Sequence, residues 1–268
     1  MSTAGGTAYA KINLALHVRE KLPDGYHRIE TIFAFCEDGD ELTAKKADEV
    51  SVEVAGPFGA AVDERDNLVL QAAETFRRNR TEHGASLHLR KLLPIASGLG
   101  GGSADAAAAL RLLNRLWGLD RPVERLISIG RQLGADVPAC ILSQTVRGEG
   151  RGDDLRPVDE ALTGTPVLLV NPRVELSTAD VFARWDGVDR GKLTDWRHGR
   201  NDLQRPAASL APQIGGILAW LSVQDGADCV RMSGSGATCF ALFKTEAKRD
   251  RAAMAVPREW WRLATRLR

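Results

Sequence analysis

A glycine-rich segment is the clearest sign of chemistry in this chain of 268 residues. Gly98, Gly100, Gly101 and Gly102 precede an alanine-rich run, residues 103–110, which predicts a helix. Glycines allow a backbone to approach a bulky anion because no Cβ intervenes. The start of the predicted helix adds unpaired N–H groups and the positive end of the helix dipole. The segment therefore predicts a cradle for a polyphosphate.

Three familiar phosphate-binding loops do not fit this segment. A P-loop requires a lysine after its glycines, and Ser103 and Ala104 stand here instead. A dinucleotide-binding fingerprint that begins at Gly98 requires a third glycine where Ser103 stands. The H-R-D and D-F-G motifs of protein kinases are absent from the sequence. The Ser103 hydroxyl can cap the predicted helix or contact a phosphate or Mg²⁺.

Two charged side chains lie in patterns that favour a role in catalysis. Residues 8–18 alternate between apolar and polar types, which predicts a half-buried strand with Lys11 and Asn13 on one face. Asp136 follows a predicted helix and precedes the apolar residues 137–139. A carboxylate in such surroundings requires a cation nearby. Lys11 could equally lie on a solvated strand face, and Asp136 could simply be a turn or capping residue.

Composition limits the class of partner. Lys and Arg together number 36 and Asp and Glu 35, for a net charge of +1, so neither a general nucleic-acid binder nor a membrane binder is indicated. The four cysteines form no C-x-x-C pair, which favours buried, reduced thiols. No apolar run reaches about 18 residues, and no signal peptide is evident. We expect a cytoplasmic protein with a small-molecule substrate and no obligate protein partner.

A cluster of Pro157, Gly164 and Pro166 favours a domain boundary, which divides the chain into residues 1–158 and 159–268. The polar residues 184–200 contain three glycines and predict a long mobile loop. Residues 213–222 predict a helix. Two predicted strands, 229–232 and 238–243, are joined by the glycine-bearing segment 233–236.

These motifs together resemble those of the GHMP small-molecule kinases. The resemblance lies in residues 10–14, 94–109 and 233–237. Within that superfamily, Lys11 to Leu14 followed by Asp24-Gly25-Tyr26-His27 and Thr31 resembles the kinases that act on 4-diphosphocytidyl-2-C-methyl-D-erythritol. Residues 134–138 and 201–203 are similar to the same family. The motifs occur in order over nearly the whole chain.

The resemblance implies an α+β fold of two domains, with a ribosomal-protein-S5-like first half and a ferredoxin-like second half. It implies an active site in the cleft between them, where ATP phosphorylates the 2-hydroxyl of the methylerythritol in the non-mevalonate isoprenoid pathway. It implies that Asp136 takes the proton from that hydroxyl and that Lys11 supplies charge and orients Asp136.

The resemblance also assigns binding residues. The ATP-binding residues it implies are Pro94, Ile95, Ala96, Ser97, Gly98, Leu99, Gly100, Gly101, Gly102, Ser103 and Ala104. The substrate residues are Asn13, Tyr26, His27, Thr178 and Phe182, with Tyr26 and Phe182 on opposite faces of the cytosine. Mg²⁺ is the expected metal ion, with Ser103 as a candidate ligand. Ala104 and Asp153 stand where the family usually has serine and glutamate.

Two alternative functions remain. Another GHMP kinase, acting on homoserine or mevalonate, would share the glycine-rich motifs, but its substrate has no base for Tyr26 and His27 to recognise. A catalytically inactive nucleotide-binding regulator would have no need of both Lys11 and Asp136.

Overall fold

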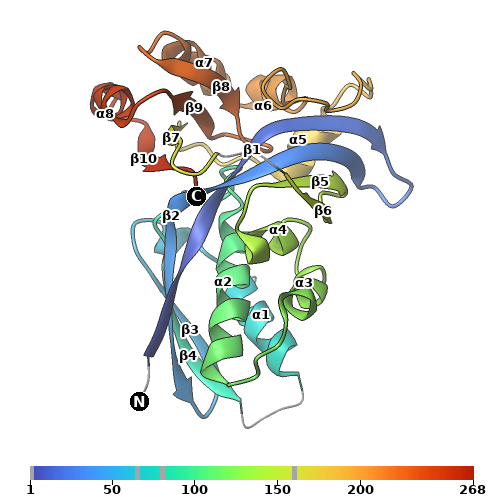
Figure 1. Ribbon diagram of the computed structural model, residues 1–268, viewed down its shortest axis with the longest axis vertical. Helices are drawn as coiled ribbons and strands as arrows, with labels where there is room; N and C mark the ends of the chain where they lie inside the picture. The colour runs from blue at the N-terminus through green and yellow to red at the C-terminus, as the bar shows by residue number, and fades with distance from the viewer. Residues whose placement is uncertain (1–2, 64–66, 79–82, 159–161) are drawn as a thin grey trace. The chain divides into compact units, whose positions relative to one another are not determined.

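The computed structural model describes residues 3–63, 67–78, 83–158 and 162–268 (Figure 1). The chain folds into two compact units that alternate along the sequence. The first unit contains the residues up to Ala10 together with Asp38–Ile95 and Gly100–Ser143, and the second contains Lys11–Glu37, Ala96–Leu99 and Gln144–Arg268. The predicted boundary at 158/159 lies beside residues outside the described ranges and stays a prediction.

The first unit packs helices on a small sheet. Strand β3 (Val50–Ala55) pairs in parallel with β4 (Gly84–Arg90), which pairs antiparallel with the last part of β2 (His27–Ala47). The helices are α1 (Leu68–Arg77), α2 (Gly101–Leu116), α3 (Val123–Gly130) and α4 (Val137–Leu142), and a short 3₁₀ helix spans Gly59–Ala61. In Figure 1, α1 and α2 lie side by side. The small buried alanines of α2 allow this close packing, and the helix predicted over residues 103–110 is confirmed.

The second unit contains a four-stranded antiparallel sheet in the order β10 (Trp261–Arg266), β7 (Pro166–Asn171), β9 (Cys239–Phe243), β8 (Ala227–Met232). The first part of β2 pairs with β5 (Val146–Gly150), which pairs with β6 (Asp154–Pro157). Strand β1 (Thr3–Lys21) pairs with β2. The helices are α5 (Thr178–Ala183), α6 (Gln204–Leu210), α7 (Gln213–Ser222) and α8 (Glu246–Ala255).

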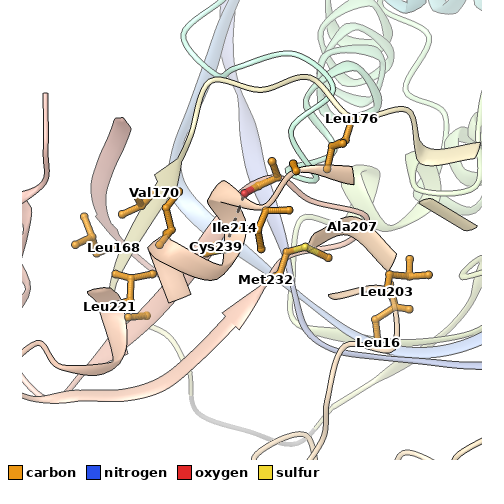
Figure 2. Close-up of a cluster of buried hydrophobic side chains, with 14 of the residues drawn as sticks. Leu16, Leu168, Val170, Leu176, Leu203, Ala207, Ile214, Leu221, Met232 and Cys239 are labelled. Carbon is orange, nitrogen blue, oxygen red and sulfur yellow. Dashed lines mark hydrogen bonds between the residues drawn. The ribbon is translucent and has the colours of Figure 1, made fainter. Parts of the chain in front are cut away.

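The core of the second unit lies between α7 and its sheet (Figure 2). Ile214 and Leu221 of α7 pack with Val170 of β7, Met232 of β8 and Cys239 of β9, all of them buried. The predicted helix over 213–222 is confirmed with the same ends. Both predicted strands of the 229–243 region are present as β8 and β9.

Residues 184–200 contain no helix and no strand, as the sequence predicts. Several contacts nevertheless hold this loop to the second unit. Leu193 and Trp196 are buried, and the Leu193 N–H donates to Glu30 Oε2 at 2.6 Å. The Arg19 guanidinium donates to Asp189 at 2.8 Å. The predicted loop is therefore anchored at its centre, because its apolar side chains enter the core and its acidic ones meet arginine.

Among the described residues, no helix combines the length and the apolar character needed to cross a bilayer.

A buried charge cluster ties the chain before the glycine-rich segment to the start of α2. The Lys91 Nζ donates to Asp40 Oδ2 at 2.6 Å and to Asp105 Oδ2 at 2.5 Å, and all three side chains are buried. Asp40 Oδ1 accepts the N–H groups of Leu92 and Leu93, at 2.5 and 2.8 Å. Buried charges require such pairing, because an isolated ion in an apolar interior is strongly unfavourable.

The cluster allows little room beside it. A Cβ added to Gly101 would lie 3.0 Å from the Lys91 Nζ, so the first residue of α2 must be small. Burial, with a contribution from the neighbouring carboxylate of Asp40, raises the pKa of Asp105 to about 7, against the opposing charge of Lys91. Two carboxylates around one ammonium therefore favour one retained proton.

We predict that Asp105 makes the stability of the protein fall as the pH rises from about 4 to about 7. The folded state holds the Asp105 proton up to about pH 7, whereas the unfolded chain releases it near the model value of 3.8. The favourable contribution is therefore complete below about pH 4 and is lost as the pH rises through 7. Asp105→Asn, which resembles the protonated acid, should gain stability relative to the unaltered protein over this range.

Urea unfolding of both proteins at several pH values between 4 and 8 measures the difference. The matched control is Asp38→Asn, a change at an exposed position two residues from Asp40. Its difference in unfolding free energy from the unaltered protein should stay constant over this pH range. A constant difference for Asp105→Asn as well would show that this carboxyl has no raised pKa.

Candidate active site

Lys11 and Asn13 of β1 are buried side by side in the second unit. The Lys11 Nζ donates to Asn13 Oδ1 at 2.9 Å and lies 5.3 Å from the centre of the Phe33 ring. The Asn13 Nδ2 donates in turn to Thr31 Oγ1 at 2.8 Å, and the Thr31 hydroxyl donates to the carbonyl of Ala15 at 2.6 Å. The bond between side chains two residues apart confirms that Lys11 and Asn13 share one face of the strand.

Hydrogen bonds join this pair to the two glycine-bearing motifs. The Asn13 backbone N–H donates to Ser233 Oγ at 3.1 Å, and the Ser233 hydroxyl donates to the carbonyl of Gly98 at 2.8 Å. The Lys11 backbone N–H donates to the carbonyl of Leu99 at 2.9 Å. Residues 11–13, 98–99 and 233, widely separated in sequence, therefore meet within one unit.

Gly98 is required by protein packing as well as by any ligand. Its φ is +76°, a conformation that favours glycine. A Cβ added there would lie 2.3 Å from the carbonyl oxygen of Ser233 and 2.9 Å from the backbone of Gly236. The sequence predicts that this glycine allows close approach of a phosphate; in the structure the close approach is to another segment of the chain.

The rest of the glycine-rich segment belongs to the start of α2 in the first unit. Gly100 precedes the helix with φ +63°, and Gly101 and Gly102 form its first turn with Ser103. The Ser103 side chain is half-buried and Ala104 is buried. The start of α2 thus presents backbone N–H groups at small residues, the arrangement that binds anions at helix N-termini.

Asp136 precedes α4 in the first unit and is half-buried. Its side chain does not cap the helix, so a purely capping role does not describe it. Helix α4 is held against α2 by Arg111, whose guanidinium donates to the carbonyl of Cys140 at 2.6 Å. Lys11 and Asp136 therefore belong to different units, and each is positioned by its own unit's contacts.

The aromatic residues form two contacts in the second unit. His27 packs on Phe182, with ring centres 4.8 Å apart and an angle of 30°, and Trp185 meets the same imidazole edge-on at 5.6 Å. Tyr26 is 53% exposed, and its ring contact is with the guanidinium of Arg151, 4.2 Å from the ring centre. The ring beside Phe182 is thus His27, and the placement of Tyr26 and Phe182 on opposite faces of a base stays a prediction.

The protonation state of His27 and one contact of Thr178 bear on this group of residues. Burial lowers the pKa of His27, and the nearby Lys21 lowers it further, so the imidazole is neutral at neutral pH. A neutral imidazole has one donor and one acceptor nitrogen. The Thr178 and Ser235 hydroxyls lie 2.9 Å apart, which joins the start of α5 to the segment 233–236.

Sequence reasoning missed several members of these clusters. Trp185 lies just beyond the end of α5, where its backbone N–H donates to the Phe182 carbonyl at 3.0 Å. The acidic Asp105 within a run of alanines requires a buried cation, which could have indicated Lys91. The contact of Arg151 with Tyr26 had no signal in the sequence, since it depends on the pairing of β5 with β2.

The residues present fit a magnesium ion only if a phosphate ligand supplies most of the oxygens that bind it. In the described ranges, no three His, Cys, Asp or Glu side chains gather in a way that could hold a metal ion. Mg²⁺ in kinases takes one or two protein oxygens, with phosphate and water for the rest. The Ser103 hydroxyl is half-buried on the first turn of α2, and its role as such an oxygen stays a prediction.

Two family models match this chain. The model of the GHMP kinases N terminal domain matches residues 67–144, and that of the GHMP kinases C terminal matches residues 186–262. The 4-diphosphocytidyl-2-C-methyl-D-erythritol kinase of Rhizorhabdus wittichii is 52% identical over 97% of this chain and 94% of its own length. The enzyme of the same name from Novosphingobium aromaticivorans is 52% identical over 98% of this chain and 92% of its own length.

The solved structures agree with these relatives. A crystal structure of a 4-(cytidine 5'-diphospho)-2C-methyl-D-erythritol kinase superposes with a TM-score of 0.83 at 30% identity, over 98% of this chain and 99% of the other. A homoserine kinase from Cytophaga hutchinsonii superposes with a TM-score of 0.71 at 17% identity, over 96% and 95%, and this likeness shows the fold alone. The fold is thus the two-domain α+β fold of GHMP kinases, and ATP is the phosphoryl donor of this superfamily. By sequence over nearly its full length and by structure, the chain belongs to the 4-diphosphocytidyl-2-C-methyl-D-erythritol kinase family.

Proposed function

We propose that this enzyme transfers the γ-phosphoryl group of ATP to the 2-hydroxyl of 4-diphosphocytidyl-2-C-methyl-D-erythritol, giving the 2-phosphate and ADP in the non-mevalonate isoprenoid pathway. The main structural support is the hydrogen-bonded cluster of Lys11, Asn13, Ser233 and Gly98, which joins three motifs of the family in one unit. Homoserine and mevalonate kinases share the fold but are 10–17% identical to this chain. An inactive regulator would not require both Lys11 and Asp136.

In this proposal Asp136 is the general base. Its carboxylate accepts the proton of the 2-hydroxyl as the hydroxyl oxygen bonds to the γ-phosphorus, and the bond from that phosphorus to the β–γ bridging oxygen breaks. In this proposal Lys11 supplies positive charge where negative charge develops. The Asn13 amide orients the Lys11 ammonium through the 2.9 Å bond.

Residues 94–104 are the proposed ATP-binding segment. The N–H groups of Gly101, Gly102 and Ser103 at the start of α2 would bind phosphate oxygens, with the helix dipole favouring negative charge. Residues 96–99, held against the 233–238 segment, would give the loop a fixed shape before ATP binds. A Mg²⁺ ion bound with ATP would neutralise phosphate charge, with Ser103 as its proposed ligand from this chain.

The proposed substrate residues are Asn13, Tyr26, His27, Thr178 and Phe182. The neutral His27 would hydrogen-bond the polar edge of the cytosine, and the exposed Tyr26 and the half-buried Phe182 would stack on the base. The exposure of Tyr26 supports this assignment, since an aromatic ring that is left partly in water gains by covering the face of a base.

The same proposal places the enzyme in the cytoplasm, where ATP and reducing conditions are found. All four cysteines are free thiols, which agrees with such an environment. We also retain the division into domains 1–158 and 159–268, because the two family-model matches fall on either side of it.

We predict that Asp136→Asn lowers kcat by about a hundredfold or more while ATP still binds, because the carboxamide cannot accept the proton. Turnover is measured with 4-diphosphocytidyl-2-C-methyl-D-erythritol as acceptor, with homoserine and mevalonate as comparison substrates. Asp153→Asn, a carboxylate outside the proposed chemistry, is the matched control. Turnover near that of the unaltered protein would remove Asp136 from the mechanism, and a preference for homoserine or mevalonate would refute the proposed substrate.

We predict that Tyr26→Ala hardly changes the melting temperature but weakens binding of the cytidyl substrate by about five- to two-hundredfold. The reason is that a base stacked on an aromatic ring is worth about 1–3 kcal/mol, whereas truncation of a core aromatic costs about 3 kcal/mol of stability or more. Phe182→Ala should weaken substrate binding in the same way, and ATP affinity should stay unchanged in both variants. Thermal melting and substrate titration separate these cases, and a large melting shift with unaltered substrate affinity would overturn the assignment of the pocket.

A further inference from the structure

Arg151 contacts Tyr26, an exposed residue of the proposed cytosine site. Its guanidinium carbon lies 4.2 Å from the centre of the Tyr26 ring, within the range of a close cation–π contact. The guanidinium therefore covers one face of the ring. Tyr26 is 53% exposed, and its backbone follows a turn at residues 23–25, so little else in its own segment restrains the ring.

A tight turn and the pairing of β5 with β2 together fix the position of Arg151. Residue 151 lies between β5 and β6, flanked by Gly150 and Gly152 with φ of +69° and +99°, and the Gly152 N–H closes the turn on the carbonyl of Glu149 at 3.0 Å. Pairing of Ile29 with Gly150 brings this turn beside the start of β2, three residues beyond Tyr26. The position of Arg151 is thus set by strand pairing and by a turn that favours glycine on each side.

Asp24 completes a three-residue arrangement. Its Oδ1 accepts the backbone N–H of Tyr26 at 3.0 Å, and its Oδ2 accepts a hydrogen bond from the Arg151 guanidinium. The bond from the Tyr26 N–H, with a further contribution from Arg151, holds the pKa of Asp24 below its usual value, so Asp24 is a carboxylate at neutral pH. One carboxylate thus orients both the backbone of Tyr26 and the guanidinium that covers its ring.

We propose that Arg151 is a positioning residue for substrate recognition: its guanidinium stacks on one face of Tyr26 and holds the ring so that the opposite face receives the cytosine. This inference rests on the proposed function, in which Tyr26 contacts the base. An exposed tyrosine without a neighbour loses side-chain freedom when it stacks on a ligand. Arg151 restrains the ring before the substrate binds, so less freedom is lost on binding. The planar guanidinium suits this role because it stacks on an aromatic face.

A direct contact between Arg151 and the diphosphate of the substrate is the competing explanation. The two explanations differ in whether the effect of Arg151 depends on Tyr26 or on a phosphate group of the ligand. A positioning residue acts only through Tyr26 and affects any ligand with a cytosine. A phosphate-binding residue acts without Tyr26 and affects only ligands with phosphate.

The first experiment is steady-state kinetics of Arg151→Ala. The KM for the cytidyl substrate should rise about two- to fivefold, the effect of an exposed cation–π contact, whereas kcat and the KM for ATP should not change. The matched control is Arg156→Ala, because Arg156 is an exposed arginine of β6 whose guanidinium pairs with Glu149 and Asp154, and this change should leave all three values unchanged. An unchanged substrate KM in Arg151→Ala, with thermal melting showing a folded protein, would overturn the proposal.

The second experiment combines Arg151→Ala with Tyr26→Ala and measures inhibition by cytidine and by CDP. If Arg151 acts through Tyr26, the double variant should equal Tyr26→Ala, and Arg151→Ala should weaken cytidine and CDP by the same factor. Additive effects, or a loss confined to CDP, would assign Arg151 to the diphosphate and refute the positioning role. If Tyr26→Ala alone leaves the substrate KM unchanged, the proposed cytosine pocket is wrong. If Tyr26→Ala raises the KM and Arg151→Ala does not, the pocket stands and only the positioning role of Arg151 is wrong.

Discussion

The contact between residues 96–99 and the 233–238 segment is the constraint on which the second unit's site depends. Gly98 comes so close to Ser233 and Gly236 that any side chain at position 98 would collide with their backbone. The Ser233 hydroxyl occupies the centre, since it accepts from the Asn13 backbone and donates to the Gly98 carbonyl. Lys11 and Asn13 are therefore oriented by a backbone contact between distant segments, and a small hydroxyl at position 233 is as necessary as the glycine.

Burial of charge is the second constraint, and it acts on the first unit. Lys91, just before the glycine-rich segment, and Asp105, just after it, are removed from water together with Asp40 of β2. Their mutual bonds offset the loss of hydration, and Asp40 also satisfies two backbone N–H groups. The result joins β2, the end of β4 and the first turns of α2. A cluster of this kind stabilises one arrangement of the loop, because any displacement leaves a buried ion without its partner.

The proposed specificity residues have a different physical character from the proposed catalytic lysine. Lys11 and Asn13 are buried on β1, whereas Tyr26 and Thr178 are exposed and Phe182 is half-buried on a short helix. Rigid surroundings suit a charge that must stabilise a reacting group, and exposed rings suit a base that must enter and leave. His27 lies between these extremes, packed between Phe182 and Trp185 and kept neutral by its partial burial.

The sequence by itself determined the features that arise from local chemistry. Alanine-rich residues 103–110 form a helix because of their intrinsic propensity, the alternating residues 8–18 form a strand that places Lys11 beside Asn13, and residues 213–222 form a helix with the predicted ends. The family, the fold class and the reaction type followed from motifs that occur in order along the chain. Spacing within a motif is a local property, so it can be recognised without knowledge of the fold.

Only the tertiary structure decided which distant groups meet. Ser233 bonds to Asn13 and Gly98 across 220 and 135 positions, Lys91 pairs with two carboxylates on different elements, and His27 lies on Phe182. The loop 184–200 is polar in composition, yet Leu193 and Trp196 anchor it in the core. Arg151 reaches Tyr26 because β5 pairs with β2 in one register. Such contacts depend on strand register and side-chain packing between remote segments, which residue types and local spacing do not encode.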